Sequence, residues 1–211
     1  MRLLFDPDSK IMQIISRICD IIILNIVFLF TCLPIFTIGA ANTALYATVF
    51  RLDTEQEGKL LSMYFRAFLR NFRQSTVIFL ILCVFFAATC VNMVRFSQLG
   101  GSFGYVLFVL SMAVFVILAM VFSYAFPLLS QFCNSTRKTL SNAMLLGVAH
   151  LPRTAVLLVV NCFPWVLMLV NLYAFIQLGF LWFALYFGAA AYFNSRVLLK
   201  VFRPYQSANF S

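Results

Sequence analysis

Charged residues are scarce in this chain. Only 10% of its 211 residues are Asp, Glu, Lys or Arg, whereas 64% are hydrophobic and the mean hydropathy is +0.99. A soluble domain of this length needs far more polar surface to cover its core. Because the hydrophobic excess extends along the whole chain, we expect residues 1–211 to form a single domain that is embedded in a membrane throughout.

Sequence motifs for catalysis and metal binding are missing. The single histidine, His150, leaves no H-E-x-x-H motif or histidine cluster. Neither a Gly-rich phosphate loop nor a G-x-S-x-G elbow occurs. The six cysteines contain no C-x-x-C pair. We therefore expect no enzyme activity, no metal site and no cofactor.

Acidic residues are also few, so the charge balance is one-sided. The chain has 15 Lys and Arg against 6 Asp and Glu, which gives a net charge of +9. In a soluble domain this excess would suggest nucleic-acid binding. In a membrane protein, basic residues in the connections between apolar runs mark the cytoplasmic side. We expect a lipid bilayer with anionic headgroups as the partner, and no nucleic acid.

What the chain does contain is a series of apolar runs. They predict an all-α polytopic transmembrane helical bundle with spans at about 11–33, 35–51, 74–94, 105–127, 154–171 and 178–199. The run 35–51 is short for a crossing, so five spans are the alternative. If it crosses, the 15 basic residues divide 14 to 1 between the two sides, and otherwise 11 to 4. The stronger bias favours six spans with both termini in the cytoplasm.

A basic amphipathic segment, 59–73, comes directly before the third apolar run. At the helical step of about 100° per residue, its basic side chains fall on one side and its aromatic side chains on the other. Such a helix lies in the membrane surface, where its basic face meets lipid phosphates or a protein partner. The candidate lipid-binding or partner-binding residues are Lys59, Arg66, Arg70 and Arg73.

The sequence also contains a weak two-half repeat. Lys59, Leu61 and Ser62 are matched by identical residues 79 positions later. Both halves have the order span, polar linker, surface helix, span. Repeated halves are common among membrane transport proteins.

Polar residues inside the apolar runs are the candidates for an intramembrane site. Asp20 follows Arg17 by one turn, and it is either a functional charge or part of an ion pair that orients the first helix. Asn25 and Asn161 either contact a solute or form hydrogen bonds between helices.

The segment after Pro34 is another candidate. Thr37 and Gly39 follow this proline, and we expect an irregular backbone there that lines a cavity. Small residues also recur at helical spacing, which favours close helix packing within the bundle or, alternatively, a homodimer face. These residues are Gly39, Thr43 and Ala47, and again Ala184, Gly188 and Ala191.

Four segments resemble the YesL-like family of bacterial membrane proteins, a domain of unknown function: LPIFTIGAANTALYATVFRL, FRAFLRNFRQS, YAFPLLSQF and AHLPRTAVLLVV. The most specific part is the spacing of Pro34, Thr37, Ile38, Gly39, Ala44, Leu45 and Tyr46, followed by Phe68, Asn71 and Phe72. Members of that family are often encoded beside carbohydrate-uptake ABC transporters and polysaccharide-degrading enzymes. The resemblance therefore implies the bacterial cytoplasmic membrane and a carbohydrate setting, without an activity.

Two functions agree with these features. The first is an accessory or regulatory component linked to carbohydrate uptake, which acts with a carbohydrate ABC transporter or a membrane sensor. The alternative is a self-contained transporter or channel for a small solute, with a homodimer as one arrangement. The features that favour the second function are the two-half pattern and the prolines inside the spans.

Overall fold

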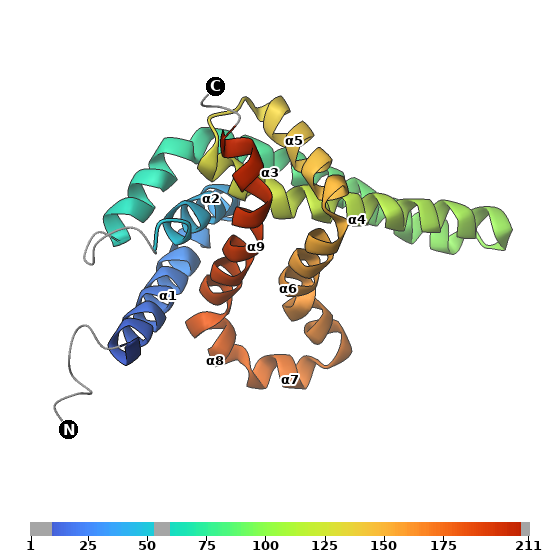
Figure 1. The fold of residues 1–211 in the computed structure, drawn as a ribbon. Helices are drawn as coiled ribbons and strands as arrows, with labels where there is room; N and C mark the ends of the chain where they lie inside the picture. Colours follow the sequence, from blue (N-terminus) through green and yellow to red (C-terminus); the bar gives the residue numbers. More distant parts are fainter. Residues whose placement is uncertain (1–9, 53–59, 208–211) are drawn as a thin grey trace.

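The computed structural model describes residues 10–52 and 60–207, and every regular element in this part of the chain is a helix (Figure 1). Four helices are long and apolar enough to cross a membrane: Ile14–Cys32, Leu60–Gln98, Gly101–Gln131 and Leu151–Val170. The expected all-α class is confirmed, and the apolar helices support a membrane protein. The expected crossings at 35–51 and 178–199 are not among these four.

The first two helices are separated at Pro34. Helix α1 (Lys10–Cys32) agrees with the expected first span. A 3-10 turn, η2 (Ile35–Thr37), then leads into α2 (Ile38–Val49). The Thr37 hydroxyl donates a hydrogen bond to the carbonyl oxygen of Pro34 (2.6 Å), which stabilises the turn. Together η2 and α2 are ~22 Å long at 1.5 Å per residue, short of the ~30 Å hydrocarbon core of a bilayer.

Helix α3 (Leu60–Gln98) is continuous over 39 residues. The sequence predicts a surface helix at 59–73 and a separate span at 74–94. The structure has one helix over both segments, so the predicted boundary near residue 73 is wrong. Neither glycine nor proline occurs within α3, so its backbone has no reason to end near residue 73. At 1.5 Å per residue α3 is ~58 Å long, about twice the thickness of the hydrocarbon core. Lys59 lies outside the described residues.

A tight turn joins α3 to α4 (Gly101–Gln131). Gly100 and Gly101 have φ angles of 63° and 67°, in the left-handed region that favours glycine. The far half of this helix pair extends away from the other helices (Figure 1). Its exposed side chains include the large apolar residues Val91, Val94, Phe103, Val106 and Leu110. An apolar exterior of this kind is what helices facing lipid present.

Two prolines of the predicted spans lie inside helices. The predicted span 105–127 ends at Pro127, but α4 continues to Gln131. Pro164 lies within α6 (Leu151–Val170), which also continues past it. Neither proline ends its helix. A proline removes one backbone hydrogen bond, and a membrane helix tolerates this loss where other groups bind the freed carbonyl.

The last expected span, 178–199, is not one regular helix. After α6 the chain forms short helices, then a π-helical turn, then a long helix. These elements are α7 (Leu172–Gln177), α8 (Gly179–Leu181), the π turn η3 (Trp182–Tyr186) and α9 (Phe187–Ser207). Helix α9 begins nine residues later than the span predicted to start at 178 and continues beyond its expected end at 199.

The two-half repeat is not confirmed. In the first half, the basic segment and the apolar span belong to one helix, α3. In the second half, α5 (Thr136–Ala149) is separated from α6 by His150, whose φ and ψ of −123° and 47° are not helical. Pro152 in the first turn of α6 disfavours a continuous helix at this point. The two halves therefore differ in construction.

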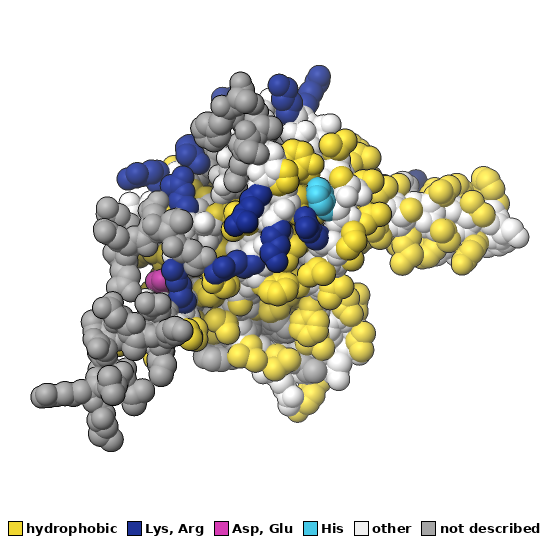
Figure 2. Space-filling model, viewed as in Figure 1, with side chains coloured by type: hydrophobic (Ala, Val, Ile, Leu, Met, Phe, Trp, Pro, Cys, Tyr) yellow, Lys and Arg dark blue, Asp and Glu magenta, His cyan; other side chains and the backbone are white. Residues whose placement is uncertain are grey.

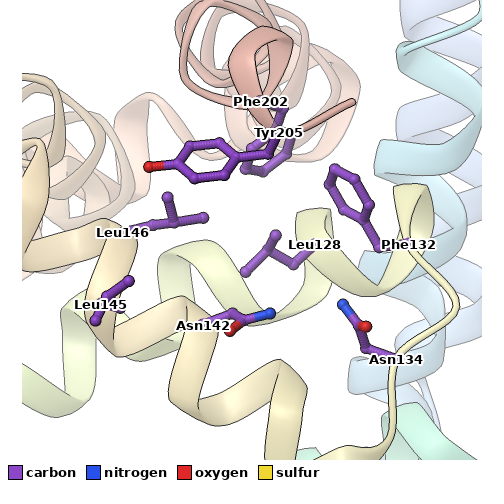
Figure 3. A pocket seen from close by; sticks show the side chains of 8 residues that line it. All are labelled: Leu128, Phe132, Asn134, Asn142, Leu145, Leu146, Phe202 and Tyr205. Carbon is purple, nitrogen blue, oxygen red and sulfur yellow. The ribbon is translucent and has the colours of Figure 1, made fainter. Parts of the chain in front are cut away.

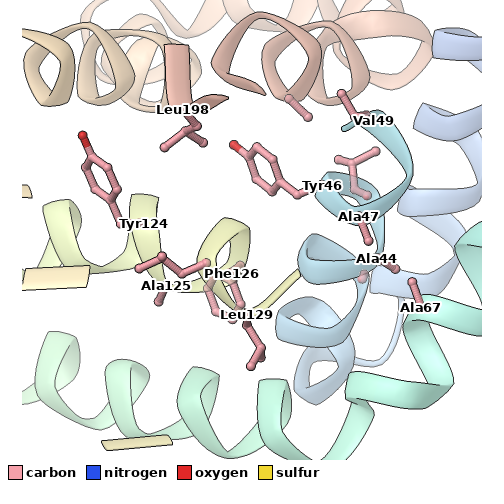
Figure 4. Packing of buried hydrophobic residues seen from close by; sticks show 14 of the residues in the cluster. Ala44, Tyr46, Ala47, Val49, Ala67, Tyr124, Ala125, Phe126, Leu129 and Leu198 are labelled. Carbon is pink, nitrogen blue, oxygen red and sulfur yellow. The ribbon is translucent and has the colours of Figure 1, made fainter. Parts of the chain in front are cut away.

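Helix α2 forms the centre of the core, and ten of its 12 residues are buried. Figure 4 shows Ala44 of α2 next to Ala67 of α3, with Phe126 of α4 and Leu198 of α9 on other sides of the same cluster. Burial on all sides explains why α2 has almost no amphipathic pattern. The short helix thereby contacts α1, α3, α4 and α9.

Small residues bring α2 into direct contact with α3. A Cβ atom on Gly39 would lie 2.5 Å from the carbonyl oxygen of Ser75 and 2.7 Å from the Cβ of Phe79. One turn later, the Thr43 hydroxyl forms a hydrogen bond with the Ser75 hydroxyl across the same interface (2.9 Å). The close helix packing expected from the small residues is thus present within the chain.

The second group of small residues also packs inside the chain. A Cβ on Gly188 would lie 2.7 Å from the carbonyl oxygen of Ile21 in α1, and Ala191 is buried. A homodimer would therefore have to use a surface other than these two small-residue faces.

We predict that Gly39→Ala lowers the free energy of unfolding by ~1–3 kcal/mol, because the added methyl group overpacks a backbone contact. Thermal unfolding in a mild detergent measures this loss. Gly179→Ala is the matched control, since nothing lies within 4 Å of the added Cβ there. Equal stability of the two variants would contradict the close contact between α2 and α3.

Candidate functional site

A cavity of about 210 Å³, the central pocket, lies where several helices meet. Its lining residues come from α1, α2, α4, α6, η3 and α9. They are Phe28, Ile38, Asn42, Leu45, Tyr46, Phe122, Ser123, Asn161, Trp165, Tyr186, Phe187, Ala190 and Ala191. None of these described residues carries a charge. The pocket thus combines hydroxyl and amide groups with several aromatic rings.

Asn161 of α6 lies at the centre of a hydrogen-bond network in this pocket. Its Nδ2 donates to the Ser123 hydroxyl of α4 (3.1 Å), and its Oδ1 accepts from the Nδ2 of Asn194 in α9 (2.8 Å). Asn194 Nδ2 also donates to the Tyr46 hydroxyl of α2 (3.3 Å), which is directed toward α9 in Figure 4. The network therefore links four helices through uncharged groups.

One polar atom of this network has no hydrogen-bond partner among the described residues. Asn194 is fully buried, and its Oδ1 lacks a donor. A buried amide oxygen without a donor costs about 1–3 kcal/mol. Asn194 is not among the residues that line the pocket, so it supports the lining residues Tyr46 and Asn161 from outside the cavity.

Pro164 frees a backbone carbonyl at the same pocket. Because proline has no N–H group, the carbonyl of Val160, four residues earlier, loses its helical donor. The hydroxyl of Tyr186 donates a hydrogen bond to this carbonyl oxygen. The freed acceptor is therefore occupied by a side chain from the π turn, and this contact fixes Tyr186 at the edge of the pocket.

Asn25 of α1 binds the start of α9. Its Oδ1 accepts a hydrogen bond from the backbone N–H of Gly188 (2.8 Å), and Asn25 is fully buried. Gly188 follows the π turn η3, where the backbone hydrogen-bond pattern of an α-helix is interrupted. Asn25 does not line the central pocket, and its observed contact is a hydrogen bond between helices.

The other candidate residues lie apart from the central pocket. Asp20 is partly buried on α1, and Arg17 donates a hydrogen bond from Nη1 to the carbonyl oxygen of Leu52. Thr37 stabilises the turn after Pro34, and Gly39 contacts α3. Of the predicted intramembrane residues, Asn161 alone is among the described lining residues, although Ile38 between Thr37 and Gly39 also lines the pocket.

The sequence analysis missed Asn42, Tyr46 and Asn194. Asn42 and Asn194 carried the same signal as Asn161, an amide side chain in or near an apolar run. Tyr46 carried no separate signal, because an aromatic residue in a membrane helix is common. Asn42 and Tyr46 line the pocket, and the packing of α2 against α9 brings Asn194 into hydrogen-bond contact with Tyr46.

Two further pockets lie nearer the basic residues. One, of about 380 Å³, is lined by Arg51, Arg66 and Arg70, but not by Arg73. The other, of about 250 Å³, lies between α4, α5 and α9. Figure 3 shows its side chains: Leu128, Phe132, Asn134, Asn142, Leu145, Leu146, Phe202 and Tyr205. In this view the amides of Asn134 and Asn142 point toward each other, and the Tyr205 hydroxyl is the other polar side-chain group among the labelled residues.

We predict that Asn25→Ala destabilises the protein by about 1–2 kcal/mol, because it removes the acceptor of a buried N–H group. Thermal unfolding in detergent measures the change. The matched control is Asn92→Ala, at an exposed position of α3. If Asn25→Ala unfolds at the same temperature as the control, the hydrogen bond to Gly188 does not stabilise the α1–α9 contact.

Comparison with known proteins gives one match. Residues 21–93 match the model of a family described as a protein of unknown function, DUF624. No curated protein and no solved structure matches the chain. The matched residues extend from the middle of α1 to the last turns of α3 and include all of α2. Residues 21–93 therefore identify a DUF624 region of unknown function, with which the resemblance to the YesL-like family is consistent.

Proposed function

We propose that this protein is an accessory or regulatory membrane component of carbohydrate uptake whose central pocket binds one sugar unit. The observation that carries this proposal is the lining of the pocket, where amides and hydroxyls lie beside aromatic rings and no charged side chain is present among the described lining residues. Sugars are uncharged, and their hydroxyl groups both donate and accept hydrogen bonds. Aromatic rings offer flat apolar surfaces for their C–H faces.

The size of the pocket supports a small ligand. Its volume of about 210 Å³ lies below the ~300–1,000 Å³ typical of sites for drug-sized ligands. The carbohydrate setting itself comes from the YesL-like resemblance, whose members are often encoded beside carbohydrate-uptake systems. A carbohydrate ABC transporter or a membrane sensor is accordingly the proposed partner.

For the topology we propose six crossings in a bacterial cytoplasmic membrane, with both termini in the cytoplasm. The hydrogen bond from Arg17 to the carbonyl oxygen of Leu52 supports a return crossing by α2, because it brings the start of α1 to the end of α2. Figure 2 supports a single basic side: Lys and Arg side chains gather over one part of the surface, whereas the α3–α4 extension is mostly hydrophobic.

We predict that Asn161→Leu weakens sugar binding by tenfold or more, because it removes a donor and an acceptor from the pocket. Isothermal titration of the purified protein with a panel of monosaccharides measures the affinity. Asn92→Leu makes the same chemical change on the exposed surface of α3 and is expected to bind like the unaltered protein. Thermal unfolding of both variants separates a loss of binding from a loss of fold.

This proposal fails if no monosaccharide binds the unaltered protein. It also fails if a sugar binds but Asn161→Leu and Asn92→Leu have equal affinities, since binding would then occur outside the central pocket.

The alternative function is a self-contained transporter or channel for a small solute. The position of the central pocket among six elements favours it. Transport coupled to an ion is less favoured than uncoupled transport. Such coupling usually requires ionisable groups in the membrane, and no charged side chain is present among the described lining residues.

Purification from native membranes in a mild detergent distinguishes the two functions. We expect a permease or sensor subunit to be recovered with the protein at a stoichiometric level. Recovery of a homo-oligomer alone, together with sugar flux in liposomes that Asn161→Leu abolishes, would instead establish the alternative.

A further inference from the structure

A pocket of about 380 Å³ lies between the end of α2 and the beginning of α3, and we call it the arginine pocket. Ser62, Arg66 and Arg70 of α3 follow one another at intervals of four residues, so they occupy one face of the helix. On the opposite side, the pocket is lined by Ala47 of α2 and by Arg51, which lies in the turn after α2. The pocket therefore has walls from two helices that pack directly against each other.

Small and charged side chains together line the arginine pocket. Ala47 and Ala67 are both 8% exposed, whereas Arg51, Arg66 and Arg70 are exposed. Arg73 is exposed one turn further along α3 and does not line this pocket.

The chemistry of the lining suits a phosphate group. Each guanidinium has five N–H donors in a planar fork that matches phosphate oxygens. None of the described lining residues is acidic, and Ser62 adds a hydroxyl donor.

The surroundings of the pocket favour a lipid as the source of the phosphate. Next to the arginines on α3 lie Leu61, Phe65 and Leu69, which are 46%, 46% and 73% exposed. They repeat at the same four-residue spacing, so an apolar row runs beside the basic row. A lipid presents a phosphate and acyl chains side by side, whereas free phosphate gives these residues nothing to contact.

We propose that the arginine pocket is a discrete site for the phosphate of an anionic phospholipid headgroup, bound by Arg51, Arg66 and Arg70. This goes beyond a diffuse basic face on 59–73, because it adds Arg51 from the turn after α2 and leaves out Arg73. The site is separate from the central pocket and does not depend on sugar binding there.

The test measures binding of short-chain phosphatidic acid and phosphatidylglycerol to the full-length protein in neutral detergent, with native mass spectrometry for stoichiometry. We expect one tightly bound anionic lipid per chain. Arg51→Gln and Arg66→Gln are expected to weaken its binding tenfold or more. Arg73→Gln removes the same charge outside the pocket and is expected to change the affinity by less than twofold.

A second set of measurements separates the effects of charge, guanidinium geometry and fold on lipid binding. Arg66→Lys retains the charge but loses the forked geometry, so we expect it to weaken binding several-fold. Thermal unfolding of each variant without lipid separates a loss of lipid binding from a loss of fold. Inorganic phosphate and short-chain phosphatidylcholine serve as comparison ligands.

Three outcomes would overturn the proposal. Equal losses for Arg66→Gln and Arg73→Gln would show a diffuse basic surface instead of a pocket. Inorganic phosphate that competes at the concentration of the lipid would make free phosphate the ligand. Phosphatidylcholine that binds as well as phosphatidic acid would remove the requirement for a net negative headgroup.

Discussion

The close approach of α2 and α3 at Gly39 is the constraint on which the rest of the structure depends. Without a side chain at this position, the two helices are near enough for Thr43 and Ser75 to form a hydrogen bond across the contact. The same short helix then presents Tyr46 to the central pocket and Ala47 to the arginine pocket. Both pockets thus depend on the position of a single buried helix.

Much of the fold follows from the sequence because apolar runs in a membrane have few alternatives to the helix. The C-terminal end of α1 was predictable from Pro34, and the turn after α3 from the adjacent Gly100 and Gly101. The continuity of α3 was missed because the sequence changes from basic and amphipathic to apolar near residue 73. This change in polarity was interpreted as the end of a helix. A change in the solvent around a helix does not interrupt its backbone hydrogen bonds.

The sites were less predictable than the fold because their residues are distant in sequence. Asn161 stood out as an amide in an apolar run, but its partner Asn194 is 33 residues away and Tyr46 is 148 residues from Asn194. Arg51 is the last residue of the predicted span 35–51 and was not among the candidate basic residues. Its importance to a pocket depends on the register between α2 and α3, which local sequence patterns do not contain.

The length of α2 has a consequence for the bilayer. Even together with η2, it would as a crossing be ~8 Å shorter than an ordinary hydrocarbon core, and a bilayer adjusts to such hydrophobic mismatch by becoming thinner around the protein. Headgroups are then drawn inward at the end of α2, where Arg51 lies. The protein would deform the membrane around it in a way that brings lipid phosphates to the level of its own arginines.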